Sequence, residues 1–165
     1  MGPIKTALYW YMRSNTGEVG PDSSLILSQC AIELLSWFVI VKSRAALSEQ
    51  GYGQLSSASE KLRLALTLLG IPWQLPAGLT KVRAFRKEWR DITEAVVQAR
   101  NYLVHPTQSR SGKRRKFKTY PWYKLWVASQ WVLELMILRL LGYTGNYRNR
   151  TRLTDFNPIE QVPWT

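Results

Sequence analysis

Residues 99–106, "ARNYLVHP", combine an arginine, an amide side chain and the only histidine in the sequence. On a helix, Asn101 and His105 lie about one turn apart on the same face, because four residues separate them. Arg100 is roughly 140° around the helix axis from His105, yet its long side chain can reach toward the helix end. Histidine serves as an acid or base near neutral pH, and the planar fork of arginine suits a phosphate. These residue types therefore predict acid–base chemistry at a phosphate, with Asn101 orienting the group.

A purely structural interpretation of the same residues is also open. His105 precedes Pro106, which lacks an amide proton and disfavours helical geometry at the residue before it, so the helix should end near His105. The histidine could then satisfy the last helical carbonyls, while Arg100 pairs with an acidic residue such as Glu33. The residue pattern alone does not separate the two interpretations.

Most of the positive charge lies around this motif. The chain has a net charge of +12, and residues 81–118 contain twelve basic and three acidic residues, which is +9 of that total. Such local basicity favours a polyanionic partner, with nucleic acid first and an acidic membrane surface second, although a solvated basic loop that aids solubility is the alternative. A basic loop is expected over 106–118. Its candidate RNA-binding residues are Arg110, Lys113, Arg114, Arg115, Lys116 and Lys118.

No metal or other cofactor is expected. One histidine and one cysteine cannot supply a zinc site without several carboxylates, and acidic residues are sparse. Asp91 and Glu94 lie one helical turn apart and could hold Mg²⁺, but the basic residues around them favour surface ion pairs. The sequence also lacks a GxxxxGK[ST] phosphate-binding loop.

The elements that must position these residues are helical, because the apolar residues recur at three- and four-residue spacing and strand patterns are weak. Helices are expected over 4–15, from a cap at Asp22 or Ser23, from Ser56 or Ser57 to Leu69, over 80–104 in one or two pieces, and from Pro121 to Gly142. Residues 49–57 are expected to form a loop. The sequence thus predicts a single all-α domain over 1–165, an up-and-down bundle of about five helices with a mostly irregular C-terminal tail over 143–165.

Two helices carry apolar stripes that are expected to face the core. In the second helix the stripe is Ile26, Leu27, Cys30, Ala31, Leu34 and Phe38. In the last helix it is Leu125, Ala128, Val132, Met136, Ile137 and Leu140. The longest apolar run, 34–41, falls short of the roughly 18 residues that a membrane span needs, so no membrane association is expected. With no signal-peptide pattern and a single cysteine, a cytoplasmic location is expected.

The stretch "RNYLVHP" resembles the signature of the HEPN nuclease superfamily, in which an arginine, a polar residue and a histidine end a helix. Arg100, Asn101 and His105 fill these three places. The stretches "ALYWYMRSN", "LILSQCAIELLSW" and "NPIEQVPW" resemble the HEPN domain of ApeA-type antiphage abortive-infection proteins. The resemblance runs from about residue 7 to residue 164.

The resemblance implies a metal-independent endoribonuclease that acts as a homodimer, with two motif helices forming one composite cleft. The RNA 2′-OH would attack the adjacent phosphorus and leave 2′,3′-cyclic phosphate and 5′-OH ends. His105 would be the general acid or base, Arg100 would stabilise the phosphorane charge and Asn101 would position the phosphate. Glu33 would support the site by orienting Arg100 or His105.

The resemblance also implies a biological setting and leaves alternatives. It suggests a prokaryotic antiphage defence or toxin effector that cleaves tRNA or another structured RNA and is controlled by a regulatory domain or an antitoxin partner. The larger ApeA-type proteins carry a region ahead of this domain, so the resemblance implies that this chain corresponds to the domain alone, as an excised domain, a split gene product or a small stand-alone member. One alternative is a catalytically inactive HEPN module that binds RNA, a nucleotide or a partner protein. Another is a helical interaction protein whose aromatic residues Trp122, Tyr123 and Trp126 dock a partner.

Overall fold

Helices dominate the computed structural model, which describes residues 2–18, 20–79, 82, 84, 89–105, 121–152 and 158–164. The main helices are α1 (Pro3–Arg13), α2 (Pro21–Trp37), α4 (Ala58–Leu69), α6 (Ile92–Val104) and α7 (Trp122–Leu140). The predicted all-α bundle is therefore confirmed. The basic loop predicted over 106–118 lies outside the described residues.

The helix starts follow from local chemistry. Both α1 and α2 have proline in the first turn, where the missing amide proton costs nothing. Helix α4 is capped as expected by Ser57, whose hydroxyl accepts a hydrogen bond from the backbone N–H of Glu60 at 3.1 Å. The predicted cap of α2 is wrong, because this helix begins at Pro21 and Asp22 lies within its first turn.

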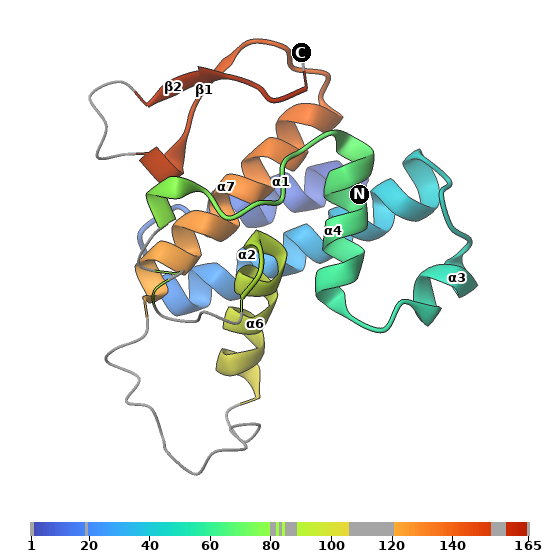
Figure 1. The fold of residues 1–165 in the computed structure, drawn as a ribbon, viewed down its shortest axis with the longest axis horizontal. Helices are drawn as coiled ribbons and strands as arrows, with labels where there is room; N and C mark the ends of the chain where they lie inside the picture. Colours follow the sequence, from blue (N-terminus) through green and yellow to red (C-terminus); the bar gives the residue numbers. More distant parts are fainter. Residues whose placement is uncertain are drawn as a thin grey trace.

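Helix α2 lies at the centre of the bundle and packs against α1, α4, α6 and α7 (Figure 1). It continues directly into a π-helical turn, Phe38–Ser43. The combined segment, 21–43, is long and apolar enough to cross a membrane by length and composition alone. However, 61% of its apolar window is buried inside the fold, which is typical of the core helix of a soluble domain.

The predicted core stripe of α2 is mostly wrong, whereas that of α7 is correct. Of the α2 stripe only Ala31 is buried, and Cys30 is exposed. The buried face instead includes Leu25, Ser28, Ile32, Leu35 and Ser36. Two of these positions are serines that bond back to the carbonyl four residues earlier, which allows a polar side chain to be buried. In α7 every predicted stripe residue is buried except Leu140, which is partly buried.

Short elements occupy two regions that were expected to be irregular. Within the predicted loop 49–57, residues Glu49–Gln54 form α3, whose cap is Ser48. In the tail, β1 (Asn146–Arg148) pairs antiparallel with β2 (Ile159–Gln161), and a short 3-10 turn lies at Arg150–Arg152. Another 3-10 turn, Ala77–Leu79, follows α4. Strands of three residues are too short to produce a readable alternation, which explains why the sequence did not predict them.

The helix predicted over 80–104 does not run through. Residues 89–91 are not helical, and α6 begins only at Ile92, although residues 82 and 84 are helical. Asp91 separates the two parts because its extended backbone and its carboxylate cap α6. The predicted helix is therefore interrupted at residues 89–91, as the alternative of two pieces allowed.

Candidate active site

Helix α6 ends where the sequence predicts. Val104 is its last residue, and the backbone N–H of His105 still donates to the carbonyl of Asn101 at 2.8 Å. The φ and ψ of His105, −123° and 67°, lie outside the helical region, as expected for a residue before proline. Figure 1 shows the end of α6 projecting from the bundle, and both Val104 and His105 are exposed. The histidine is thus accessible to a ligand or a second protein.

Arg100 points in a different direction from this projecting end. Its guanidinium Nη2 donates to Oε1 of Glu33 on α2, so the expected pairing of these two residues is confirmed. The Arg100 side chain is 23% exposed and that of Glu33 is 41% exposed. A guanidinium has five N–H donors, so this ion pair leaves donors available for another anion.

A pocket of about 250 Å³ lies beside this ion pair, between α2, α3, α4 and α6. Its polar lining consists of Gln29, Glu33, Ser36, Tyr52, Lys61 and Arg100. Its apolar walls are Ile32, Ala58 and Leu62. Arg100 lines this pocket, whereas Asn101 and His105 belong to the projecting end of α6. One chain therefore divides the three motif residues between two adjoining surfaces.

Two groups near the pocket have raised pKa values. Burial, followed by the charge of Glu33, raises the pKa of the Tyr52 hydroxyl. Burial and Glu33 also raise the pKa of the Cys30 thiol, against the opposing charge of Arg100. Cys30 is therefore less able to form the reactive thiolate than an ordinary cysteine.

The pocket contains residues that the sequence analysis did not identify. Gln29 lies four residues before Glu33, and a glutamine within the apolar run "LILSQCAIELL" is a visible sign that a polar side chain shares the helix face with Glu33. Tyr52 and Lys61 come from α3 and α4, and the Lys61 Nζ lies 4.5 Å from the centre of the Tyr52 ring. Their proximity depends on the packing of α3, which was predicted as a loop.

The opposite end of α6 is held by ion pairs. Asp91 accepts from the backbone N–H groups of Thr93 and Glu94 at 2.9 and 3.0 Å, and Arg63 Nε donates to it at 3.0 Å. Burial raises the pKa of Asp91, but the hydrogen bonds of Thr93, Glu94 and Arg63 outweigh it and hold the pKa below its usual value. Glu94 also binds Arg90, so the predicted pairing with a neighbouring basic residue is confirmed for Glu94. For Asp91 the prediction of a surface ion pair is wrong, because its carboxylate is buried and pairs with Arg63 of α4.

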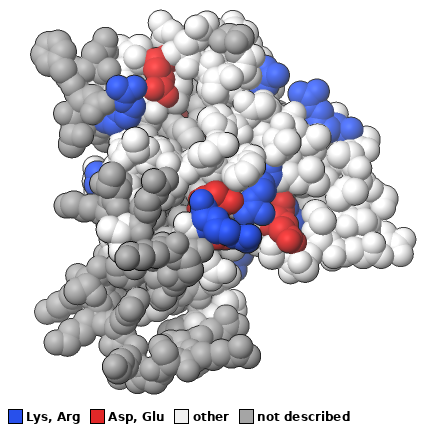
Figure 2. Space-filling model, viewed as in Figure 1, with Lys and Arg blue, Asp and Glu red and all other residues white. Residues whose placement is uncertain are grey.

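Two further sets of residues concern a possible metal site and the predicted RNA-binding loop. Within the part of the chain that the structure describes, no three His, Cys, Asp or Glu side chains come together as metal ligands. The six predicted RNA-binding residues between 110 and 118 lie outside the described residues. Figure 2 shows that, at the centre of one face, described basic side chains adjoin acidic ones.

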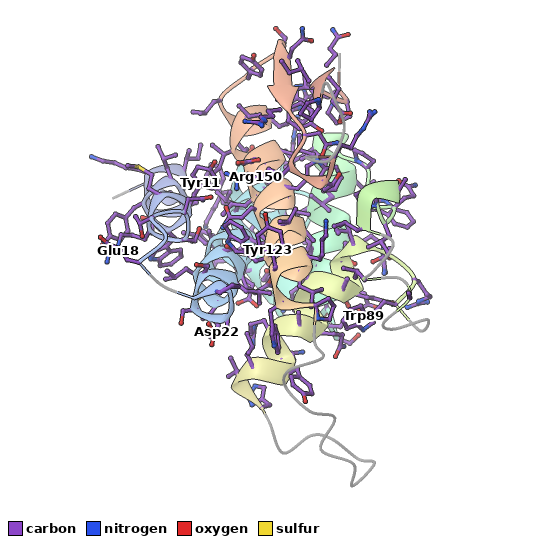
Figure 3. The ribbon with its side chains drawn as sticks, turned by 90° about the vertical axis from the view of Figure 1, so that its left-hand side faces the viewer. Tyr11, Glu18, Asp22, Trp89, Tyr123 and Arg150 are labelled. Carbon is purple, nitrogen blue, oxygen red and sulfur yellow. The ribbon has the colours of Figure 1, made fainter. Side chains whose placement is uncertain are left out.

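A second polar cluster, which the sequence did not indicate, joins α1, α7 and the C-terminal segment. Tyr11 donates to Glu134 at 2.5 Å, and Arg150 Nε donates to the same carboxylate oxygen at 2.5 Å. Figure 3 shows Tyr11 and Arg150 close together, and Arg150 Nη2 also donates to the Tyr11 hydroxyl at 3.1 Å. Burial and Glu134 raise the pKa of Tyr11 to about 12. Nearby, Gln130 donates to Ser14 and Ser28 within the core. These contacts join α1, α2, α7 and the C-terminal segment.

The aromatic residues proposed for partner docking are mainly packing residues. Trp122 and Trp126 are partly buried and pack against the core, and only Tyr123 is strongly exposed, at 53%. The Tyr102 and Trp122 ring centres are 5.9 Å apart and link the end of α6 to the start of α7. This ring contact therefore ties the last turns of α6 to α7.

Comparison with known proteins gives one family and one relative. The family model described as the YopA C-terminal domain matches residues 1–160. The chain is 28% identical over 159 residues to the SPbeta prophage-derived uncharacterized protein YopA of Bacillus subtilis (strain 168). This match covers 95% of the chain but 34% of the relative, so the chain spans about a third of that protein's length. No solved structure matches the chain.

Proposed function

The chain belongs to the YopA C-terminal domain family, and we propose that it is a metal-independent endoribonuclease. The observation that carries this proposal is the exposed His105 at the projecting end of α6, one turn after Asn101. Arg100 supplies a permanent positive charge on the same helix, and Glu33 restrains its guanidinium. This set contains an acid–base group, a phosphate-binding group and an amide. It is the combination that the HEPN resemblance requires.

The proposed reaction uses the RNA itself as the nucleophile. His105 removes the proton of a 2′-OH, or protonates the leaving 5′ oxygen, while the 2′ oxygen attacks the adjacent phosphorus. Arg100 stabilises the added negative charge of the phosphorane, and Asn101 orients a phosphate oxygen. The products carry 2′,3′-cyclic phosphate and 5′-OH ends. DNA lacks the nucleophile and is not cut.

The separation of Arg100 from the projecting end favours a homodimer. Two copies that meet through the last turns of α6 would bring the His105 of one chain toward the arginine side of the other. The exposed Val104, at 46% exposure, would be covered in such an interface. The proposed setting is the cytoplasm, in antiphage defence or as a toxin acting on tRNA or another structured RNA. A regulatory domain or antitoxin would hold it inactive, and the prophage origin of the relative fits this setting.

The decisive experiment compares the wild-type chain with His105→Ala on total tRNA and on a single-stranded RNA, in EDTA. Wild-type protein should generate cyclic-phosphate ends, and the variant should not. Light scattering on both proteins checks that the oligomeric state is the same. Equal cleavage by the two proteins would remove His105 from the mechanism.

The ion pair between Arg100 and Glu33 favours one alternative, a non-catalytic module that binds RNA, a nucleotide or a partner protein. Since Glu33 occupies one donor of the arginine, Arg100 already has a structural role. Stable RNA binding by the wild-type protein with no cyclic-phosphate product after long incubation would favour this alternative.

A further inference from the structure

Lys61 supplies the uncompensated charge of the pocket beside Arg100. Within the part of the chain that the structure describes, Lys61 forms no ion pair, and its Nζ atom lies over the Tyr52 ring, 4.5 Å from the ring centre. The other two charged residues of the pocket, Glu33 and Arg100, pair with each other. The net charge of the pocket lining is therefore +1, and Lys61 carries it.

The pocket holds this charge where a ligand can reach it. The side chains of Glu33, Lys61 and Arg100 are all partly exposed, so the pocket is open to solvent beside them. Its apolar walls include Ile32 and Leu62, which are buried within the core. These walls offer no competing polar partner, and a charged contact beside them is stronger than in water because the local dielectric constant is lower.

The net charge of the pocket selects among phosphates. A phosphodiester inside a nucleic-acid strand carries one negative charge, which matches the single uncompensated charge of Lys61. A phosphate monoester carries about −1.5 to −2 at pH 7, and the Glu33 carboxylate would repel the additional charge. The pocket therefore suits an internal phosphate of a strand better than a free mononucleotide.

We propose that Lys61 binds a phosphodiester that flanks the scissile phosphate of an RNA strand. This proposal rests on the proposed function, because Arg100 connects the two places: it lines the pocket, and it precedes His105 by five residues, about 7.5 Å of helical rise. His105 is not among the residues that line the pocket, so the phosphate at Lys61 is not the one on which this histidine acts. Lys61 is thus a binding residue that positions the strand.

The binding arm of the test measures fluorescence anisotropy of a labelled 2′-O-methyl RNA on the full chain at several salt concentrations. This RNA has no free 2′-OH and is not cut. Each phosphate contact to a single strand contributes about 0.7 to the slope of log affinity against log salt. Lys61→Met removes the charge and keeps the aliphatic stem, so the slope should fall by about 0.7. The affinity at 50 mM salt should fall about eightfold, which is what that slope gives between 1 M and 50 mM.

Matched variants separate the proposed contact from a general effect of charge or folding. Lys5→Met makes the same change at an exposed position on α1, outside the pocket, and should keep the wild-type slope. Lys61→Arg keeps the charge and should also keep the slope. Urea unfolding of Lys61→Met should have the wild-type midpoint, because no ion pair is removed, and Lys61→Gln carries the same test if Lys61→Met does not fold. An unchanged slope at Lys61, or an equal fall in Lys5→Met, overturns the proposal.

The cleavage arm uses the unmodified RNA. Lys61→Met should raise KM and leave kcat within about twofold of the wild type, since a ground-state contact is lost. Cleavage with slope and KM unchanged in Lys61→Met overturns the phosphate site and leaves the ribonuclease standing. A slope that depends on Lys61, without any cleavage, supports the phosphate site and overturns the ribonuclease. Inorganic phosphate that competes with the RNA at constant ionic strength in the wild type, but not in Lys61→Met, overturns the strand as the ligand.

Discussion

The two ends of α6 differ in construction. At the first turn, Asp91 is 2% exposed and is bound by backbone amides and by Arg63. At the last turn, Val104 and His105 are exposed and project from the bundle (Figure 1). At the first end the carboxylate of Asp91 is bonded within the fold, whereas at the last end the side chain of His105 is exposed. Substitutions at the two ends should therefore affect different measurements.

The largest effect is expected at the exposed end. His105→Ala should reduce RNA cleavage by about 10²- to 10⁴-fold, the usual contribution of a general acid or base. The free energy of unfolding should change by less than about 0.5 kcal/mol, because an exposed side chain is removed. Initial cleavage rates and urea unfolding provide the two measurements. A large loss of stability would show that the two ends are not distinct in role.

The corresponding change at the buried end should act on stability. Asp91→Ala removes the cap of α6 and the partner of Arg63, so it should cost about 3 kcal/mol in unfolding free energy. Because the pKa of Asp91 is lowered in the folded state, its contribution is present above the ordinary value of 3.8 and is lost as the pH falls through the folded-state pKa. The gap between wild type and variant should close in acid. A constant gap would contradict this assignment.

A third prediction tests a buried cluster away from α6. Tyr11→Phe should cost about 2 kcal/mol at neutral pH, because Glu134 and Arg150 lose a hydrogen-bond partner. The folded-state pKa of Tyr11 is raised from 10.0 to about 12, so its stabilisation is full below pH 10 and is lost as the pH rises through 12. Unfolding by urea at pH 8 and at pH 11 measures this. Identical pH dependence in wild type and variant would remove Tyr11 as the cause.

A small loss of stability is expected at the pocket. Glu33→Gln breaks the pair with Arg100, but the carboxylate is 41% exposed, so the cost should be below about 1 kcal/mol. This variant should also cleave RNA more slowly, because the guanidinium of Arg100 loses the partner that restrains it. Circular dichroism should show that the variant remains folded. A cost near that of Asp91→Ala would place the pair among the stabilising contacts instead.

The buried face of a helix could be predicted from the sequence only where apolar residues lie on one side of it. In α7 the buried stripe was readable because Leu125, Ala128 and Val132 recur at helical spacing. In α2 apolar residues occur on nearly every side, and the buried serines Ser28 and Ser36 look polar in the sequence. Periodicity therefore selected the wrong face of a helix that is surrounded by other helices.

The site was predictable only where it is local in sequence. The end of α6 at His105 follows from the proline after it. The Arg100–Glu33 pair joins positions 67 residues apart, so the sequence offered Glu33 only as one possible acidic partner. The pocket was not predictable, because Tyr52 reaches it through α3, a short helix in a glycine-containing segment, and Lys61 reaches it from α4. The Tyr11–Arg150 contact spans 139 residues, and no local pattern connects such positions.

That sequence separation has a consequence for folding kinetics. Joining α1 to the turn at Arg150 requires closing a long loop, whose entropic cost is met only after α2 and α7 have packed. The Tyr11–Glu134–Arg150 cluster is thus expected to form late and to have little structure in the transition state. Weakening it should speed unfolding more than it slows refolding. The Tyr11–Glu134–Arg150 cluster would then control the unfolding rate of the chain and have little effect on its folding rate.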